Sequence, residues 1–297
     1  MEQAYRRTID ELITRYHLEP ELRDLYVEGP SDKMLFLCFF EYLKCEHVEI
    51  FEIDTVNIQD SLINKLRLQS RNRDRVIALS LELDRLLQGN VECLACVADS
   101  DFDFLLGRTH DSRYLLYTDY TSVDLYFWSE DVVDRFFKLG VRRLASDPKR
   151  LLANFAAVLQ EVFSIRAANE KLGWGLQWIQ FTRSCSIEDN LVVFDADKFI
   201  EKYLSKNRRR QQLKEFIDAC NQLRAVNVAT CKQRIRGGDF FELLGWYALK
   251  QIGSRARKYR DPDVVRAIIL PTVNLNLLAD EELFVKLLAK YSRSRFR

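Results

Sequence analysis

The chain has 297 residues, 47% of them hydrophobic, and its 45 basic residues nearly balance 44 acidic ones, giving a net charge of +1. This length suits two domains, and the near-zero charge excludes nucleic-acid recognition by overall charge, so any such contact must come from locally clustered cations. No uninterrupted apolar run reaches the roughly 18 residues of a membrane span, and no signal-peptide pattern follows Met1, so we expect a cytoplasmic protein without membrane contact. The seven cysteines have irregular spacing, which predicts reduced thiols.

The first part of the chain alternates predicted strands with predicted helices. An amphipathic helix is expected over residues 1–17. The strands are short apolar runs at residues 25–27, 48–53, 92–98 and 114–117. Helical segments are expected between them near 32–44 and over 59–89. This alternation predicts an α/β fold with a parallel sheet.

Beyond residue 128 the pattern becomes mainly helical. Long helices are expected at 149–168 and 211–223, with one strand at 191–194. We therefore expect an α/β domain over 1–128, which includes the N-terminal helix, and a mainly helical domain over 129–297 for contact with a substrate or partner. Asp195 and Asp197 follow the late strand, where they form either a second acidic site or the start of a helix.

Acidic residues follow two of the predicted strands. Glu28 comes directly after the first strand, and Asp99, Asp101 and Asp103 come after the strand at 92–98. Ligands of parallel α/β sheets bind at the carboxyl ends of the strands, and carboxylates gathered there repel one another unless a divalent cation lies between them. Mg²⁺ or Mn²⁺ suits such oxygen ligands.

The spacing of the aspartates indicates how they would act. Asp99 and Asp101 alternate, so on an extended segment they face the same side and share one cation. Asp103 has the same parity and either binds a second ion or caps a helix. Asp119 and Asp124 follow the fourth strand, and each is either an additional acidic site residue or the first residue of a helix.

Other kinds of site lack their motifs. Cys93 and Cys96 have the spacing of a zinc half-site, but no second Cys or His pair lies at a matching distance. No Gly-x-Ser-x-Gly elbow and no Walker loop are present, so we do not expect a serine nucleophile or ATP hydrolysis by this chain.

Basic residues form local clusters. The candidate nucleic-acid contacts are Arg208, Arg209, Arg210, Arg255, Arg257 and Lys258. Further clusters contain Arg67, Arg71 and Arg73, and Arg293, Arg295 and Arg297. Each basic cluster alone is equally typical of a solvent-exposed helix face. The clusters together favour contact with nucleic acid. Tyr259 lies between Arg257 and Arg260 and is expected to stack on an unpaired base, which favours RNA loops or single strands over duplex DNA.

Three segments resemble the TOPRIM family of metal-dependent catalytic domains. They are Val27-Glu28-Gly29-Pro30-Ser31-Asp32-Lys33, Asp99-Ser100-Asp101-Phe102-Asp103 and Tyr117-Thr118-Asp119-Tyr120-Thr121-Ser122-Val123-Asp124. Their details resemble the stand-alone TOPRIM nucleases of the overcoming-lysogenization-defect type, and within these the effector subunits of PARIS anti-phage systems, which are encoded beside ABC-type ATPases. The resemblance covers residues 25–128. The chain differs from the family pattern in having Asp124 in place of glutamate and Arg236-Gly237-Gly238-Asp239 in place of a Gly-His-Asp turn.

The resemblance implies a Rossmann-like TOPRIM core and a Mg²⁺-dependent endonuclease. Glu28, Asp99 and Asp101 would be catalytic, and these three with Asp103 would hold the metal. It also implies a toxic defence effector that an ABC-type ATPase partner keeps silent, with tRNA as the favoured target. We expect a homodimer in the active state, because symmetric dimers are the commonest oligomers. The alternatives are a DNA endonuclease and a non-catalytic TOPRIM scaffold or sensor subunit of an ATPase complex.

Overall fold

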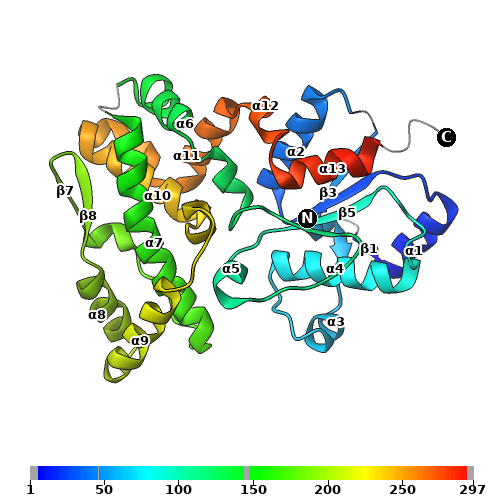
Figure 1. The fold of residues 1–297 in the computed structure, drawn as a ribbon, viewed down its shortest axis with the longest axis horizontal. Coiled ribbons are helices and arrows are strands. Elements are labelled where there is room, and N and C mark those ends of the chain that lie inside the picture. Colours follow the sequence, from blue (N-terminus) through cyan, green and yellow to red (C-terminus); the bar gives the residue numbers. More distant parts are fainter. Residues whose placement is uncertain (1–5, 46, 144–146, 293–297) are drawn as a thin grey trace, which may run out of the picture. The chain divides into compact units, whose positions relative to one another are not determined.

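The computed structural model describes residues 6–45, 47–143 and 147–292, and the chain divides into two compact units (Figure 1). Unit 1 contains Met1–Ser100, Thr109–Asp119 and Asn274–Arg297. Unit 2 contains Asp101–Arg108 and Tyr120–Val273. The chain therefore crosses between the units several times, whereas the sequence led us to expect a single boundary after residue 128.

Unit 1 is built on a four-stranded parallel sheet with strand order β3-β2-β5-β6. The strands are β2 (Asp24–Val27), β3 (Glu49–Glu52), β5 (Leu94–Ala98) and β6 (Leu115–Tyr117). A separate parallel pair joins β1 (Arg7–Thr8) to β4 (Val56–Asn57). The predicted α/β class with a parallel sheet is confirmed.

Helices cover both faces of this sheet. They are α1 (Ile9–Leu18), α2 (Pro30–Tyr42), α3 (Asp60–Lys65), α4 (Asn72–Leu87), α12 (Leu275–Leu278) and α13 (Glu282–Ser292), and a 3-10 turn, η1, spans Ile53–Thr55. In Figure 1, α2 and α13 lie on one side of the sheet and α4 on the other. Side chains of β2 and β5 are buried on both faces, as the unbroken apolar runs predicted.

The C-terminal helix completes unit 1. The ring centroid of Phe284 on α13 lies 5.5 Å from that of Phe36 and 4.6 Å from that of Phe39 on α2. Asn276 accepts a hydrogen bond of 2.7 Å from the hydroxyl of Tyr42. The ring contacts of Phe284 explain why residues 274–292 pack in unit 1 and not in the helical unit where we expected them.

The N-terminal helix is shorter than expected. Helix α1 begins at Ile9, because Thr8 and Glu11 form a reciprocal capping box and Arg7–Thr8 pair as β1. The expected helical residues 1–5 lie outside the described part of the chain.

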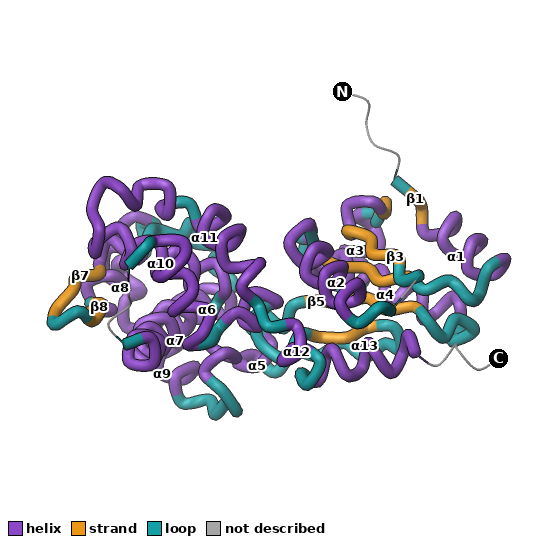
Figure 2. The backbone as a smooth tube through the Cα atoms, turned by 90° about the horizontal axis from the view of Figure 1, so that it is seen from above, coloured by secondary structure: helices purple, strands orange, loops and turns teal. Residues whose placement is uncertain are grey.

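Unit 2 is mainly helical (Figure 2). Its helices are α5 (Asp103–Leu106), α6 (Glu130–Arg135), α7 (Pro148–Leu172), α8 (Ala196–Lys206), α9 (Leu213–Arg224), α10 (Gly237–Ile252) and α11 (Pro262–Ile269), with a π-helical segment, η3, at Phe136–Val141. Short 3-10 helices include η2 (Val123–Phe127), η4 (Phe181–Ser184) and η7 (Gly253–Arg260). The expected helical domain is therefore present, and the expected strand at 191–194 is β8 (Leu191–Phe194), paired antiparallel with the unexpected β7 (Cys185–Glu188).

Helix α7 is the long central helix of unit 2. Among the described residues it is the one helix long and apolar enough to cross a membrane by length and composition, with a mean hydropathy of 1.3 over 18 residues. However, 61% of that window is buried in the structure, as in an ordinary core helix. Such a helix is weak grounds for a membrane protein.

Candidate active site

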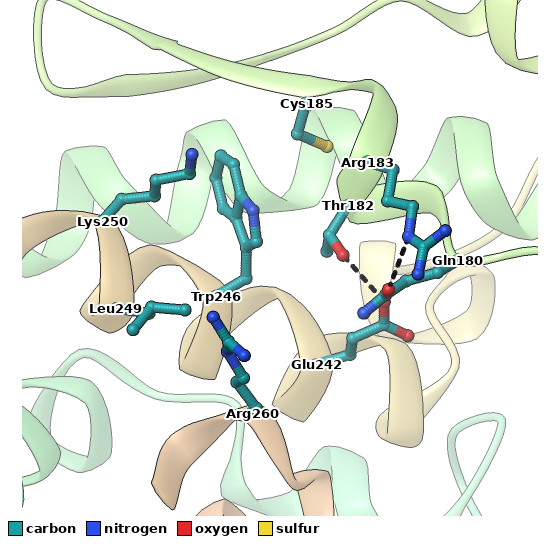
Figure 3. A pocket seen from close by; sticks show the side chains of 9 residues that line it. All are labelled: Gln180, Thr182, Arg183, Cys185, Glu242, Trp246, Leu249, Lys250 and Arg260. Atoms are coloured by element: carbon teal, nitrogen blue, oxygen red, sulfur yellow. Dashed lines mark hydrogen bonds between the residues drawn. The ribbon is translucent and has the colours of Figure 1, made fainter. Parts of the chain in front are cut away.

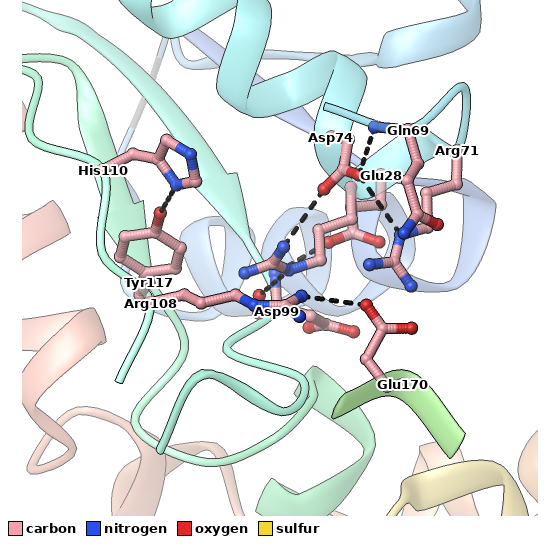
Figure 4. Close-up of polar contacts among 10 residues, drawn as sticks. Glu28, Gln69, Arg71, Asp74, Asp99, Arg108, His110, Tyr117 and Glu170 are labelled. Carbon is pink, nitrogen blue, oxygen red and sulfur yellow. Dashed lines mark hydrogen bonds and ion pairs between the residues drawn. The ribbon is translucent and has the colours of Figure 1, made fainter. Parts of the chain in front are cut away.

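Glu28 and Asp99 meet at the carboxyl ends of two neighbouring parallel strands. Glu28 follows β2 and Asp99 follows β5, and these strands pair directly. The side-chain Oε1 of Glu28 accepts a hydrogen bond of 2.7 Å from the backbone N–H of Asp99 (Figure 4). The structure thus places the Glu28 carboxylate against the backbone of Asp99, at the sheet edge where both residues were expected.

Two side chains at the start of α4 hold the backbone of this pair. Asn72 Nδ2 donates to the carbonyl of Glu28 at 2.9 Å. Arg73 Nε donates to the carbonyl of Asp99 at 2.6 Å. We call these two side chains the α4 clamp, because one short segment fixes the ends of both strands.

Arg73 is itself fixed by a buried ion pair. Its guanidinium lies 3.1 Å from Oδ1 of Asp74, and Arg73 and Asp74 are only 7% and 3% exposed. Oδ2 of Asp74 accepts hydrogen bonds from the N–H of Gln69 at 2.9 Å and from Nε of Arg71 at 3.3 Å (Figure 4). The expectation that Arg73 contacts phosphate is wrong, because this side chain is buried and serves the clamp.

Helix α2 also begins at this edge. The chain turns at Gly29, and Pro30 is the first helical residue, which suits its fixed φ. Oδ2 of Asp32 accepts a hydrogen bond of 3.1 Å from the N–H of Gly29. This contact holds the turn that presents Glu28.

Asp101 and Asp103 belong to unit 2 and do not continue the strand. Strand β5 ends at Ala98, and Asp101 has a left-handed backbone with φ of 45°. The N–H of Asp101 donates to the carbonyl of Thr121 at 2.8 Å, and Asp103 is the first residue of α5. The predicted alternation of Asp99 and Asp101 on an extended segment is therefore wrong, because the chain turns at this point.

The later aspartates take part in structural contacts. The carboxylate of Asp119 accepts hydrogen bonds of 3.2 and 3.1 Å from the N–H of Leu283, near the start of α13. Asp195 accepts a hydrogen bond of 3.0 Å from the N–H of Lys198 and caps α8. The helix-start interpretation is confirmed for Asp195, whereas Asp119 begins no helix of its own and instead accepts from the first turn of the distant helix α13.

Asp124 pairs with Arg266 in unit 2. The guanidinium donates to both carboxylate oxygens, at 3.0 and 2.8 Å, and the carboxylate side chain is 14% exposed. Burial raises the pKa of Asp124, and the charge of Arg266 opposes this shift. The Cβ of Asp124 would lie 2.1 Å from a methyl group placed on Gly237, so this glycine permits the contact.

Asp239 makes a second bidentate pair in unit 2. Its carboxylate accepts two hydrogen bonds of 2.7 Å from Arg166, and the side chain is 2% exposed. The guanidinium carbon of Arg166 lies 3.6 Å from the ring centroid of Trp178. Asp239 therefore stabilises the start of α10 against α7.

The basic candidates have varied surroundings. Arg208, Arg210, Arg257 and Lys258 are exposed, and the guanidinium of Arg209 lies 5.1 Å from the ring centroid of Trp174. The side chain of Arg255 and residues Arg293, Arg295 and Arg297 lie outside the described part of the structure. Tyr259 is 2% exposed and its hydroxyl donates to the carbonyl of Gly140, so the predicted stacking of this ring on a base is wrong.

The donor set at the sheet edge suits a hard divalent cation. Within residues 6–45, 47–143 and 147–292, no three His, Cys, Asp or Glu residues are grouped closely enough to form a metal centre of their own. Mg²⁺ commonly uses only one or two protein carboxylates, with water and substrate phosphate as the remaining ligands. Glu28 and Asp99 provide two such carboxylates, so the pair fits Mg²⁺ or Mn²⁺ better than zinc.

The α4 clamp is the part of the site that the sequence did not predict. The sequence feature that could have indicated the clamp is the polar segment Arg71-Asn72-Arg73-Asp74, which precedes the apolar residues 76–79 of the same helix. Comparison of the sequence with models of known protein families and with curated proteins found no match. Support for the candidate site therefore comes from its own residues and their geometry.

Proposed function

We propose that this protein is a metal-dependent nuclease of the TOPRIM type. The proposal depends on one observation: Glu28 and Asp99 lie at the ends of adjacent parallel strands and are joined by a hydrogen bond. The α4 clamp binds the backbone carbonyls of both residues. A carboxylate pair at this edge is suited to bind a cation and a phosphate group together.

Phosphodiester hydrolysis requires water to attack phosphorus, the bond to one ester oxygen to break, and the proton of the water to be removed. Asp99 and Glu28 would hold Mg²⁺ or Mn²⁺, which neutralises charge on the phosphate and lowers the pKa of bound water. Glu28 would also accept the proton of the attacking water and pass it to the leaving ester oxygen. The α4 clamp keeps the backbone of both residues in place, so the carboxylates need little reorganisation during the reaction.

The biological role proposed here comes from the TOPRIM resemblance. The chain would be the toxic effector of an anti-phage system of the PARIS type, active in the cytoplasm and silenced by an ABC-type ATPase partner. RNA, and tRNA in particular, is the proposed substrate. The active form would be a homodimer.

Induced expression of wild type and Asp99→Ala, followed by sequencing of cellular RNA and DNA ends, tests both the activity and its substrate. We expect new tRNA ends with wild type and none with Asp99→Ala. New ends found only in DNA would show that DNA, and not RNA, is the substrate. The same new ends with wild type and with Asp99→Ala would refute the proposal. With purified protein, EDTA should stop cleavage and Mg²⁺ or Mn²⁺ should restore it, whereas zinc should not.

A further inference from the structure

A polar pocket lies in unit 2, built without the residues of the candidate active site (Figure 3). Its volume is about 470 Å³, within the range of about 300–1,000 Å³ typical of ligand pockets. It is lined by Gln180, Thr182, Arg183, Cys185, Glu242, Trp246, Leu249, Lys250 and Arg260. These residues come from the η4–β7 segment, from α10 and from the end of η7.

Close packing of η7 on α10 places Arg260 at this pocket. A Cβ atom on Gly245 of α10 would lie 1.9 Å from the carbonyl oxygen of Tyr259, so only glycine allows the two backbones to come this close. The buried ring and hydroxyl of Tyr259 anchor the same segment, because the hydroxyl donates to the carbonyl of Gly140. Arg260 is the next residue, so its backbone is fixed beside the pocket that its side chain lines.

The charge of the pocket favours an anion. Three cationic side chains line it, those of Arg183, Lys250 and Arg260, and no ion pair of theirs occurs among the described residues. The only lining carboxyl is that of Glu242, which accepts a hydrogen bond of 3.0 Å from the hydroxyl of Thr182. A phosphate group could therefore be bound by several guanidinium and ammonium donors.

The remaining lining groups suit a planar base. The indole of Trp246 stands within the pocket, with Nζ of Lys250 at 5.5 Å from its ring centroid (Figure 3). Glu242 and Gln180 lie on the other side of the pocket, where Gln180 Oε1 accepts a hydrogen bond of 3.2 Å from Arg183 (Figure 3). Aromatic faces stack on every base, and carboxyl and amide groups pair with base edges.

We infer that this pocket binds a nucleotide, with its base against Trp246 and its phosphate on the cationic side chains that line the pocket. An acidic peptide fits less well, because its carboxylates would meet Glu242 and gain nothing from the indole face. The same chemistry is offered by a free mononucleotide and by one nucleotide of an RNA strand. The inference does not depend on nuclease activity, since a mononucleotide contains no internucleotide bond to cut.

Calorimetric titration of the full chain with AMP, inorganic phosphate and hexaglutamate tests this inference. We expect AMP to bind more tightly than phosphate. The double variant Arg183→Glu with Arg260→Glu should weaken AMP binding at least about tenfold. Lys214→Glu is the matched control, because Lys214 is an exposed cation of unit 2 outside the pocket, and it should bind AMP normally. Trp246→Ala should weaken AMP binding while leaving phosphate binding unchanged.

The source of the nucleotide is distinguished with a single-stranded hexa-adenylate and the Glu28→Gln protein, which prevents cleavage of the strand. Tighter binding of the strand than of AMP identifies a nucleotide within RNA, and the reverse order identifies a free mononucleotide. Absence of AMP binding at millimolar concentration would overturn the inference. Binding that charge reversal leaves unchanged, or hexaglutamate binding as tight as that of AMP, would also overturn it.

Discussion

Replacing Arg73 by methionine tests whether the α4 clamp supports the candidate active site. Arg73→Met keeps most of the side-chain volume but removes the hydrogen bond of 2.6 Å to the Asp99 carbonyl and the ion pair of 3.1 Å with Asp74. Loss of one partner from a buried ion pair costs about 3–5 kcal/mol, and loss of a hydrogen bond with a charged group about 1.5–3 kcal/mol. Asp74 keeps its contacts with Gln69 and Arg71, so we expect a loss of about 2–4 kcal/mol in the free energy of unfolding.

Urea unfolding followed by circular dichroism measures this loss. Arg85→Met is the matched control on the same helix, because Arg85 pairs with Glu82 at the surface and its side chain is 59% exposed. The control should unfold close to the wild-type midpoint. Arg73→Met should also cleave more slowly under native conditions, since the Asp99 backbone is no longer held. A stability loss below about 1 kcal/mol with unchanged cleavage would refute the clamp.

Three further predictions concern unit 2 and assembly. Gly245→Ala should destabilise the protein by about 1–3 kcal/mol, because the added Cβ meets the Tyr259 carbonyl. Gly238→Ala is the control and should not destabilise it, because a Cβ there meets only the flexible end of an arginine side chain. Thermal unfolding of both variants tests this prediction. Burial, and to a smaller extent repulsion from Asp239, raises the pKa of Glu242. The stability that the protonated Glu242 carboxyl contributes is therefore fully present below its unfolded pKa of about 4.3 and is lost as the pH rises through its pKa in the folded protein. Glu242→Gln should therefore raise the melting temperature relative to wild type more at pH 7 than at pH 4, and an equal shift at both pH values would contradict this. Finally, the chain alone should self-associate, and the proposed ABC-type ATPase partner should prevent this; native mass measurements with and without that ATPase check both. A free monomer that cleaves at full rate would contradict this proposal.

The sheet and its acidic edge could be predicted because their signals are local. An unbroken apolar run such as Cys93-Leu94-Ala95-Cys96-Val97-Ala98 indicates a buried parallel strand, and the parallel arrangement then brings Glu28 and Asp99 to one edge. Asp101 was misplaced, because its left-handed turn depends on a backbone contact with Thr121.

Contacts between distant segments could not be predicted. The sequence predicts a phosphate ligand at Arg73, because the charge of this residue is visible in the sequence and its burial is not. The sequence likewise predicts a stacking ring at Tyr259, because the basic neighbours of this residue are visible and the close approach to Gly245 that accompanies its burial is not. The return of Phe284 to the sheet unit likewise depends on a contact with Phe36, about 250 residues earlier in the chain.

The most direct test of the proposed nuclease is the cleavage rate of purified Glu28→Gln on labelled tRNA with Mg²⁺. Glutamine keeps a side-chain oxygen that can accept the N–H of Asp99, so the strand ends stay joined while one negative charge is removed. Glu92→Gln is the matched control, since Glu92 is exposed and precedes β5 at the opposite end of the strand. The proposal predicts no cleavage above background by Glu28→Gln and full cleavage by Glu92→Gln. A Glu28→Gln protein that cleaves at the wild-type rate would contradict it.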